Sequence, residues 1–274
     1  MTIVKPAPAL IALLLCDFGS AQVNGNAFPK AVLFAQSNSR GAVARNARGL
    51  ALGKQGQLDA AIAEFQEAIK IKPDYAPAHA NLGIALRQKG DVDGAISAFN
   101  QAVALQPTDA ELHASLASLF HRKNDFPKAI AAFRVAVKYK PNSAELRTNL
   151  GYLLGLSGDL PGSVKELESA IRLQPDLAEA HYYLGLSQWL SKDVDKAIRS
   201  FRAAVRLKPD RAEAFYYLGA ALLQKGTAPQ DVQAALVALQ TAIKLNPGFA
   251  EARGSLGIAL RESNQLDEAV AQFR

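Results

Sequence analysis

The chain has 274 residues and a formal net charge of +6, and 49% of its residues are hydrophobic, 20% charged and 7% aromatic. This size and balance indicate one or two ordinary globular domains. The single cysteine, Cys16, excludes a disulfide framework and a cysteine-based zinc site, and no apolar run reaches the roughly eighteen residues of a membrane-spanning helix.

Residues 1–21 have the pattern of a secretory signal peptide. Lys5 supplies a positive charge, residues 7–16 form an apolar core too short to span a bilayer, and residues 19–21 are small enough for cleavage. The sequence therefore predicts an exported protein, periplasmic or secreted. If the segment is instead a poorly ordered N-terminus, or an extra helix that caps the first repeat, the chain is cytoplasmic.

Cys16 raises lipidation as an alternative, because bacterial lipoprotein signals place a cysteine after a small residue. Leu15 precedes it here and is larger than that pattern requires. Residues 22–41 are predicted to form a linker or a partial N-terminal helix.

Prolines then recur at a fixed interval. They are 34 residues apart from Pro73 to Pro209, and Pro247 follows after 38 residues. A period of this length is the signature of stacked structural repeats. With an alanine at the start of each, the units are residues 42–75, 76–109, 110–143, 144–177, 178–211, 212–249 and 250–274, the last being truncated within its second helix.

Each unit has the pattern of two helices. In the second unit, Leu82-Gly83 marks the first helix, Gly90-Asp91 the turn and Phe99 the second helix. The small residues allow the helices to approach closely, and each Phe is expected to fill the space between hairpins. Four capping boxes are predicted at the starts of first helices: Thr108 with Glu111, Asn142 with Glu145, Asp176 with Glu179, and Asp210 with Glu213.

In its period, its small-residue pairs and its prolines, the sequence resembles a tetratricopeptide repeat protein over residues 42–274. The resemblance implies an all-α fold, a right-handed α-α superhelix in which antiparallel helix pairs stack into a solenoid with a continuous core. It also implies a concave groove, lined mainly by the first helix of each unit, that binds extended or helical peptides.

Three departures from the repeat carry predictions. Arg48 stands where other units have Leu, which predicts a less well packed first hairpin, and Ser163 and Leu167 replace Ala and Phe in the fourth unit. Four extra residues, 227–230, predict about one additional helical turn in the sixth unit, and Pro229 suits a first helical turn.

The last unit is expected to leave part of its apolar face uncovered. Leu256, Leu260 and Phe273 would lie on that face, because the sequence stops at Arg274 inside the second helix. We therefore expect weak self-association through the C-terminal repeat.

The basic excess is interpreted as helix-end chemistry. Lysines and arginines gather where helices are predicted to end, at residues 70–73, 138–141 and 206–209. Aspartates gather at the opposite ends: Asp91, Asp125, Asp159 and Asp193. Both placements complement helix dipoles, so we expect no nucleic-acid partner.

The predicted groove combines amides and aromatic rings. Asn81 and Asn149 lie five residues after the opening alanine, where an amide can pair with a ligand backbone, and Ser115 interrupts this ladder. Tyrosines follow in the fifth and sixth units, and Tyr and Trp are frequent anchors of binding surfaces. The predicted groove residues are Asn81, Asn149, Tyr152, Tyr182, Tyr183, Trp189, Tyr216 and Tyr217. Several of these rings could instead fill the space between repeats, as we expect for His181 and Phe215.

Nothing in the sequence indicates catalysis. His79, His113 and His181 recur at one repeat position, which favours a structural role over convergent metal ligation. No glycine-rich phosphate loop is present. We predict no catalytic residue, no metal site and no cofactor.

Two hypotheses on function remain. The first is a non-enzymatic adaptor that binds a protein or peptide in the groove, and the second is the recognition arm of a larger enzyme, such as a peptide-modifying glycosyltransferase, present here as a fragment. The signal-like segment favours the first, and the sequence ending inside a helix favours the second.

Overall fold

The computed structural model describes residues 28–273 except residue 227, with side chains from residue 39 to residue 272. The predicted signal segment and Cys16 lie outside the described residues. These form fourteen helices and no strand: α1 (Phe28–Lys54), α2 (Leu58–Ile71), α3 (Ala76–Lys89), α4 (Val92–Leu105), α5 (Ala110–Arg122), α6 (Phe126–Tyr139), α7 (Ala144–Leu156), α8 (Leu160–Leu173), α9 (Ala178–Leu190), α10 (Val194–Leu207), α11 (Ala212–Lys225), α12 (Pro229–Leu245), α13 (Ala250–Glu262) and α14 (Leu266–Phe273). None of these helices combines the length and the apolar character needed to cross a membrane.

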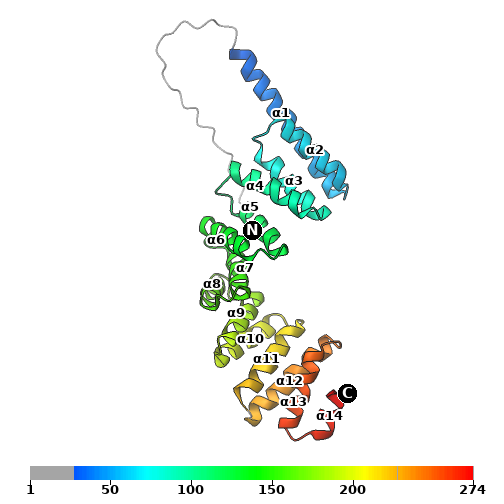
Figure 1. Cartoon of the computed structure of the whole chain (residues 1–274), viewed down its shortest axis with the longest axis vertical. Helices are drawn as coiled ribbons and strands as arrows, with labels where there is room; N and C mark the ends of the chain where they lie inside the picture. Colours follow the sequence, from blue (N-terminus) through cyan, green and yellow to red (C-terminus); the bar gives the residue numbers. More distant parts are fainter. Residues whose placement is uncertain (1–27, 227, 274) are drawn as a thin grey trace, which may run out of the picture.

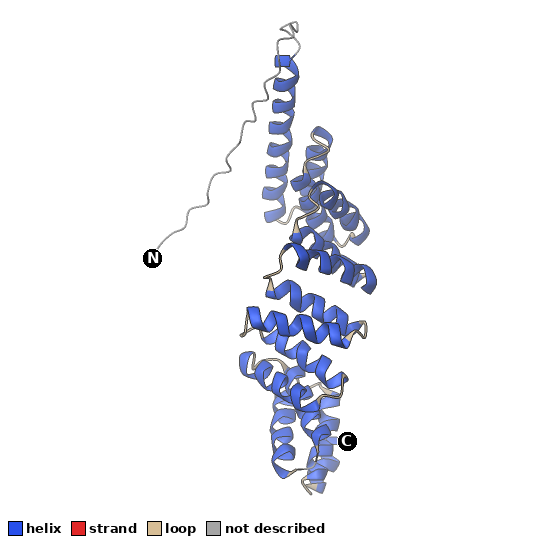
Figure 2. Cartoon of the chain, turned by 90° about the vertical axis from the view of Figure 1, so that its left-hand side faces the viewer, coloured by secondary structure: helices blue, strands red, loops and turns tan. Residues whose placement is uncertain are grey.

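The helices pair consecutively and the pairs stack. Each odd-numbered helix packs against the helix that follows it, and each even-numbered helix packs against the first helix of the next pair. The result is an elongated, curved stack with α1 at one end and α14 at the other (Figure 1), and its successive hairpins lie one after another along the long axis (Figure 2). The all-α repeat architecture predicted from the sequence is confirmed.

Small residues in the first helices let the second helices approach closely. A methyl group added to Gly83 would come within 2.8 Å of the Phe99 ring, and one added to Gly185 within 2.6 Å of the Phe201 ring. Both rings are fully buried. The predicted pairing of a small residue with a phenylalanine is therefore confirmed.

The turn inside each hairpin has one residue with a positive φ. Glycine occupies this position in four hairpins and accepts a positive φ without strain. The residues at this position are Gly56, Gly90, Asn124, Gly158, Lys192, Gly226 and Asn264. Six of these residues have φ between 58° and 92°, whereas Gly226, in the unit with the four extra residues, has φ 153° and ψ −176°. The shared turn conformation of the six explains why their hairpins repeat so regularly.

All four aspartates expected at the starts of second helices occupy N-caps, and three of them make side-chain cap bonds; Asp193, before α10, makes none. The carboxylates of Asp91, Asp125 and Asp159 accept backbone N–H bonds at the N-termini of α4, α6 and α8. The predicted capping boxes of the first helices are wrong, because each N-cap lies one residue later than predicted. Asp109 and Ser143 cap α5 and α7, whereas Leu177 and Arg211 occupy the N-caps of α9 and α11 and make no side-chain cap.

The departures from the repeat have clear structural consequences. Arg48 is directed to solvent and lies 3.4 Å from Glu64, while Phe65 remains buried against Gly49, so Arg48 does not loosen the first hairpin. The leucines at the same position of later units, such as Leu116 and Leu150, pack against the second helix of the preceding unit. No described helix precedes α1, so Arg48 has no such packing to disturb. The extra turn of the sixth unit is confirmed, because α12 has 17 residues, against 14 in α4, and begins at Pro229.

The predicted uncovered C-terminal face is not observed for the two leucines. Leu256 and Leu260 are buried with Leu236 and Leu239 of α12 and Ala269 of α14. The expectation of their exposure is wrong, because α14 covers them. The side chain of Phe273 lies outside the described residues.

Candidate functional site

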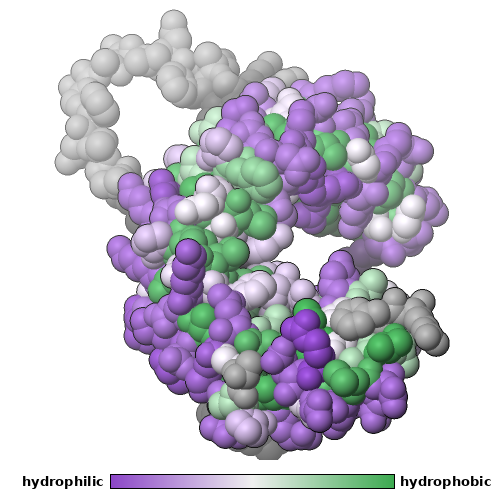
Figure 3. All heavy atoms as spheres, turned by 60° about the horizontal axis from the view of Figure 1, so that its bottom comes forward, coloured by the Kyte–Doolittle hydropathy of each residue, from purple (hydrophilic) through white to green (hydrophobic). Residues whose placement is uncertain are grey.

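Exposed apolar side chains recur on the first helices. Leu50, Ile84 and Ile258 lie eight residues after the opening alanine of their units, and Leu156 and Leu190 lie twelve residues after it. All five side chains are 38–59% exposed. We call the surface that these positions share the groove face. In the view of Figure 3 the molecule is mostly hydrophilic and hollowed across its middle, with apolar residues in separate patches.

Three cavities open along the groove face. The first, of 240 Å³ between α1 and α3, is apolar and is lined by Leu50, Phe65, Ile84 and Asn81, among others. The second, of 220 Å³ between α5 and α7, is polar, and we call it the polar pocket. It is lined by Arg87, Glu111, Ala114, Ser115, Ser118, Phe133, Ser143, Glu145, Leu146 and Asn149.

The third cavity, between α7 and α9, is small and apolar, with a volume of 70 Å³. We call it the tyrosine pocket, and it is lined by Tyr152, Gly155, Leu156, Tyr183, Leu186, Ser187 and Leu190. Gly155 leaves the space open, because five of the other six units have a larger side chain at its position and only the first unit, with Gly53, also has a glycine. Tyr152 and Tyr183 were predicted groove residues, whereas the sequence analysis did not single out Leu156 and Leu190. Their signal in the sequence was a leucine as the last residue of two consecutive first helices, α7 and α9, where the other first helices end in a charged residue.

The aromatic residues form a continuous chain of contacts. The ring centroids of Tyr152 and Tyr183 are 4.5 Å apart, those of Tyr182 and Tyr183 are 5.4 Å apart, and those of Tyr182 and Tyr217 are 6.1 Å apart. His121 extends the chain beyond Tyr152, at 5.7 Å. Aromatic contacts at these separations stabilise the packing of neighbouring units. The chain of rings therefore links four consecutive first helices.

Tyr182 belongs to the core and does not lie on an accessible surface. Its side chain is 6% exposed, and the guanidinium carbon of Arg211 lies 3.9 Å from its ring centroid. Burial raises the pKa of the Tyr182 phenol far above its usual value, because the phenolate would lose its hydration. The sequence placed Tyr182 in the groove, and the structure corrects that placement.

The remaining predicted rings are half-buried. Tyr217 stacks on Phe201 at 5.9 Å and meets Trp189 at 5.3 Å, and the indole N–H of Trp189 donates to the side-chain oxygen of Gln224. Tyr216 packs 4.9 Å from Phe249. Burial raises the pKa of the Tyr217 phenol. It also raises the pKa of Tyr152, which is less deeply buried. These rings contribute to packing between units and remain partly exposed.

The two asparagines of the broken ladder differ in their partners. Asn81 donates its amide N–H to the side-chain oxygen of Asn46 at 2.9 Å. Asn149 makes no side-chain hydrogen bond to another described residue and lines the polar pocket. Of these two asparagines, only Asn149 has an amide without a hydrogen-bond partner among the described residues, so its whole amide can pair with the backbone of a ligand.

The recurring histidines have a structural partner. The Nε2 atoms of His79, His113 and His181 lie 2.8–2.9 Å from the carbonyl oxygens of Pro73, Pro107 and Pro175. Arg147 makes the equivalent bond to Pro141, at 2.9 Å. In each of these units the side chain three residues after the opening alanine bonds to the loop that precedes its helix, and the sequence did not predict this bond. Within the described residues, no cluster of His, Cys, Asp or Glu is placed to hold a metal ion.

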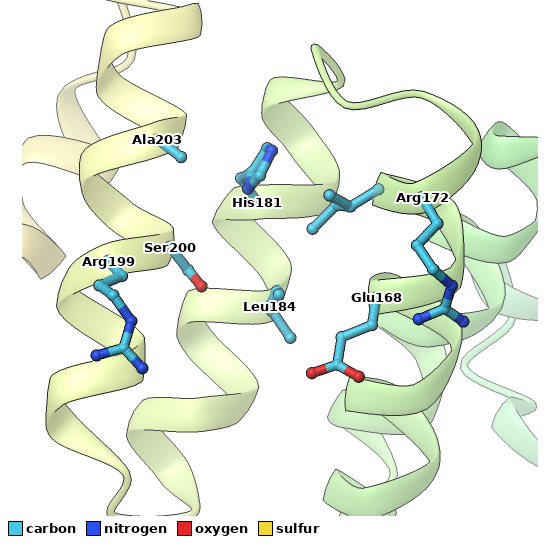
Figure 4. A pocket seen from close by; sticks show the side chains of 8 residues that line it. Glu168, Arg172, His181, Leu184, Arg199, Ser200 and Ala203 are labelled. Atoms are coloured by element: carbon cyan, nitrogen blue, oxygen red, sulfur yellow. The ribbon is translucent and has the colours of Figure 1, made fainter.

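A further cavity, of 370 Å³, opens on the side of the second helices. Figure 4 shows Glu168 and Arg172 of α8 on one side, Arg199 of α10 on the other, and His181 and Leu184 of α9 between them. His181 already bonds to Pro175, and Arg172 donates to Ser169. This cavity brings together none of the residues predicted for the groove.

Comparison with known proteins identifies the repeat. A family model described as tetratricopeptide repeat matches residues 27–236 in six overlapping segments, and a second model with the same description matches residues 227–274. No curated protein matches the chain.

Solved structures share the fold at low identity. YrrB, described as a TPR protein with an unusual peptide-binding site, is 22% identical, with 69% of this chain and 95% of YrrB covered and a TM-score of 0.59. MamA is 27% identical, with 60% of this chain and 87% of MamA covered and a TM-score of 0.54. The pilF protein of Pseudomonas aeruginosa is 16% identical, with 79% and 97% covered and a TM-score of 0.65.

Proposed function

Because the chain belongs to the tetratricopeptide repeat family, we propose that it is a non-enzymatic scaffold that binds an extended or helical segment of another polypeptide along the groove face. Proteins of this family typically bind protein or peptide partners and are usually not catalytic. YrrB, which shares the fold, is described as having a peptide-binding site. This description supports a binding role for the present chain without naming its partner.

One observation carries the proposal. Leucine and isoleucine side chains are exposed at recurring positions of five first helices, and four of these five residues line the two apolar cavities. Leu50 and Ile84 flank the first cavity, and Leu156 and Leu190 flank the tyrosine pocket. Exposed apolar side chains gathered on one face mark interaction surfaces more often than scattered ones do. A peptide side chain inserted between such pairs would bury them.

The tyrosine pocket offers the sharpest test. Peptides selected from a displayed random library on the full chain are expected to bind the Leu156→Ser/Leu190→Ser variant about tenfold more weakly, a loss of about 1.4 kcal/mol. Fluorescence anisotropy with labelled synthetic copies of the selected peptides measures the change. Both substitutions replace exposed side chains, so circular dichroism should show unchanged helicity.

A matched control lies on the second helices. Leu105 and Leu173 are similarly exposed at the ends of α4 and α8, away from the groove face. The Leu105→Ser/Leu173→Ser variant should bind the peptides as the wild type does. Equal binding by the groove variant, or an equal loss in both variants, would contradict the proposed function.

A further inference from the structure

The tyrosine pocket lies next to the polar pocket on the same helix. Asn149, which lines the polar pocket, and Tyr152, which lines the tyrosine pocket, are three residues apart on α7. Residues at this spacing are neighbours on a helix surface, with Cβ atoms about 5–6 Å apart. One bound segment can therefore occupy both pockets at once.

Carboxylates border this part of the groove face. The second residue of five consecutive first helices is a glutamate, and all five are exposed: Glu111, Glu145, Glu179, Glu213 and Glu251. We call them the glutamate row. Glu213 and Glu251 lie close enough to Tyr217 that their charges help to raise the pKa of its phenol. The row therefore runs beside the aromatic residues of the groove face.

Much of this negative charge is not neutralised within the described part of the chain. Lys140 lies 2.7 Å from Glu111, and Arg211 lies 3.9 Å from Glu213. Among the described residues, no cation forms an ion pair within 4.0 Å with Glu145 or Glu179, the two members on the helices that form the tyrosine pocket. Lys140, which is paired with Glu111, also has its pKa raised by the charge of Glu145, so its single charge is shared between these two carboxylates. Arg87 is the one cation in the described lining of the polar pocket, and the two carboxylates of Glu111 and Glu145 line it as well.

We propose that the segment bound on the groove face carries a lysine or arginine beside an apolar residue, an inference that rests on the proposed function. The apolar side chain enters the tyrosine pocket, between Leu156 and Leu190. The cationic side chain lies in the polar pocket, near Glu145, and Asn149 pairs with the backbone of the segment. Further cations of the same partner lie along the glutamate row.

Charge complementarity decides between possible partners. An acidic segment would place like charges beside the row, which disfavours binding, whereas a basic one is attracted to it. Because the carboxylates are exposed, each contact is modest and is screened by salt. The apolar contact therefore supplies most of the affinity, and the glutamate row selects the sign of the partner's charge.

The test uses peptides selected on the full chain from a displayed random library. Clones that depend on the groove, identified by weaker binding to Leu156→Ser/Leu190→Ser, are expected to be enriched in lysine and arginine. Their synthetic copies should bind the Glu145→Gln/Glu179→Gln variant about three- to tenfold more weakly at low ionic strength, and less so in high salt. Replacing the lysine of such a peptide by glutamine should remove the difference between the two proteins.

The Glu168→Gln/Glu268→Gln variant is the matched control, since it removes the same charge from exposed positions of second helices. It should bind the peptides as the wild type does. Neutral or acidic groove-dependent peptides, or equal losses in the two glutamine variants, would overturn this inference while leaving the proposed function intact. The absence of any groove-dependent peptide would instead refute the proposed function itself.

Discussion

Two adjacent tyrosines of α9 show how a single position decides between packing and binding. Tyr182 is buried beneath Arg211, whereas Tyr183 lines the tyrosine pocket. A step of one residue turns a side chain by about 100° around a helix, enough to move it from the core to the surface. The phenol of Tyr182 must therefore stay neutral in the folded state, while that of Tyr183 reaches the edge of the pocket.

The buried phenol predicts a loss of stability at alkaline pH. Burial raises the pKa of Tyr182 in the folded chain, so the unfolded chain loses its phenolic proton first, near pH 10. The stability that this group contributes is complete below that pH and is lost as the pH rises above it. We expect the free energy of unfolding, from urea titrations, to fall from about pH 10 upward and to fall less steeply in Tyr182→Phe.

Tyr139 provides the comparison, because it is exposed at the end of α6. Tyr139→Phe should leave the pH dependence close to that of the wild type. If both substitutions flatten it equally, the dependence does not arise from the burial of Tyr182.

From the sequence, the helix that carries each groove residue was predicted more reliably than the direction in which its side chain points. The repeat register placed Tyr152 and Tyr183 correctly on the first helices, and both line the same pocket. It could not separate Tyr182 from them, because the burial of this ring depends on a residue at the far end of the same unit, Arg211, which directly precedes α11. Asn81 and Asn149 occupy equivalent positions, yet only Asn81 meets a neighbouring amide.

At the level of helices, the interface between α8 and α9 departs from the apolar pattern of its neighbours. Ser163 replaces the alanine of other units and is completely buried. Its hydroxyl lies 2.7 Å from both the carbonyl oxygen of Gly151 and the hydroxyl of Ser187, which is 4% exposed. The hydroxyl of Ser163 therefore links α8 to the backbone of α7 and to the side chain of Ser187 on α9, and each buried hydroxyl has a hydrogen-bond partner.

This pair predicts a non-additive mutational effect. Ser163→Ala leaves the hydroxyl of Ser187 buried without that partner, and a group left in this state costs about 1–3 kcal/mol. Ser163→Ala/Ser187→Ala removes both hydroxyls and should be close to the wild type in stability. Urea unfolding of the two single variants and the double variant measures the coupling. Costs that simply add in the double variant would show that the two hydroxyls do not depend on each other.

The helix boundaries were predictable because the repeat period specifies them. Six first helices begin at the expected alanines, from Ala76 to Ala250. The caps were not predictable from residue preference, because the N-cap is the residue directly before the alanine, where Leu177 and Arg211 cannot form the expected bond. At these positions the proline-containing loop and the packing of neighbouring helices define the start of the helix.

At the level of the whole molecule, stability is distributed along the stack. Each hairpin packs against its neighbours in sequence, so the free energy of folding is approximately a sum of local terms. Buried residues around α9–α12 include Phe201 and Leu222, which contact helices on both sides. At the other end, Phe65 packs with Ala61, Ile62 and Ala85. The two ends of the stack and its middle should therefore open separately.

Two core substitutions test this distribution through hydrogen exchange read by mass spectrometry. Phe65→Ala removes a buried ring from the first hairpin, at a local cost of about 3–5 kcal/mol, and should abolish protection in α1 and α2 while α9–α11 keep theirs. Leu222→Ala costs about 2–5 kcal/mol and should lower protection on both sides of α11, because its side chain joins two hairpins. The prediction depends on each hairpin contacting only its neighbours. A uniform loss of protection along the chain in both variants would show a single cooperative unit and contradict it.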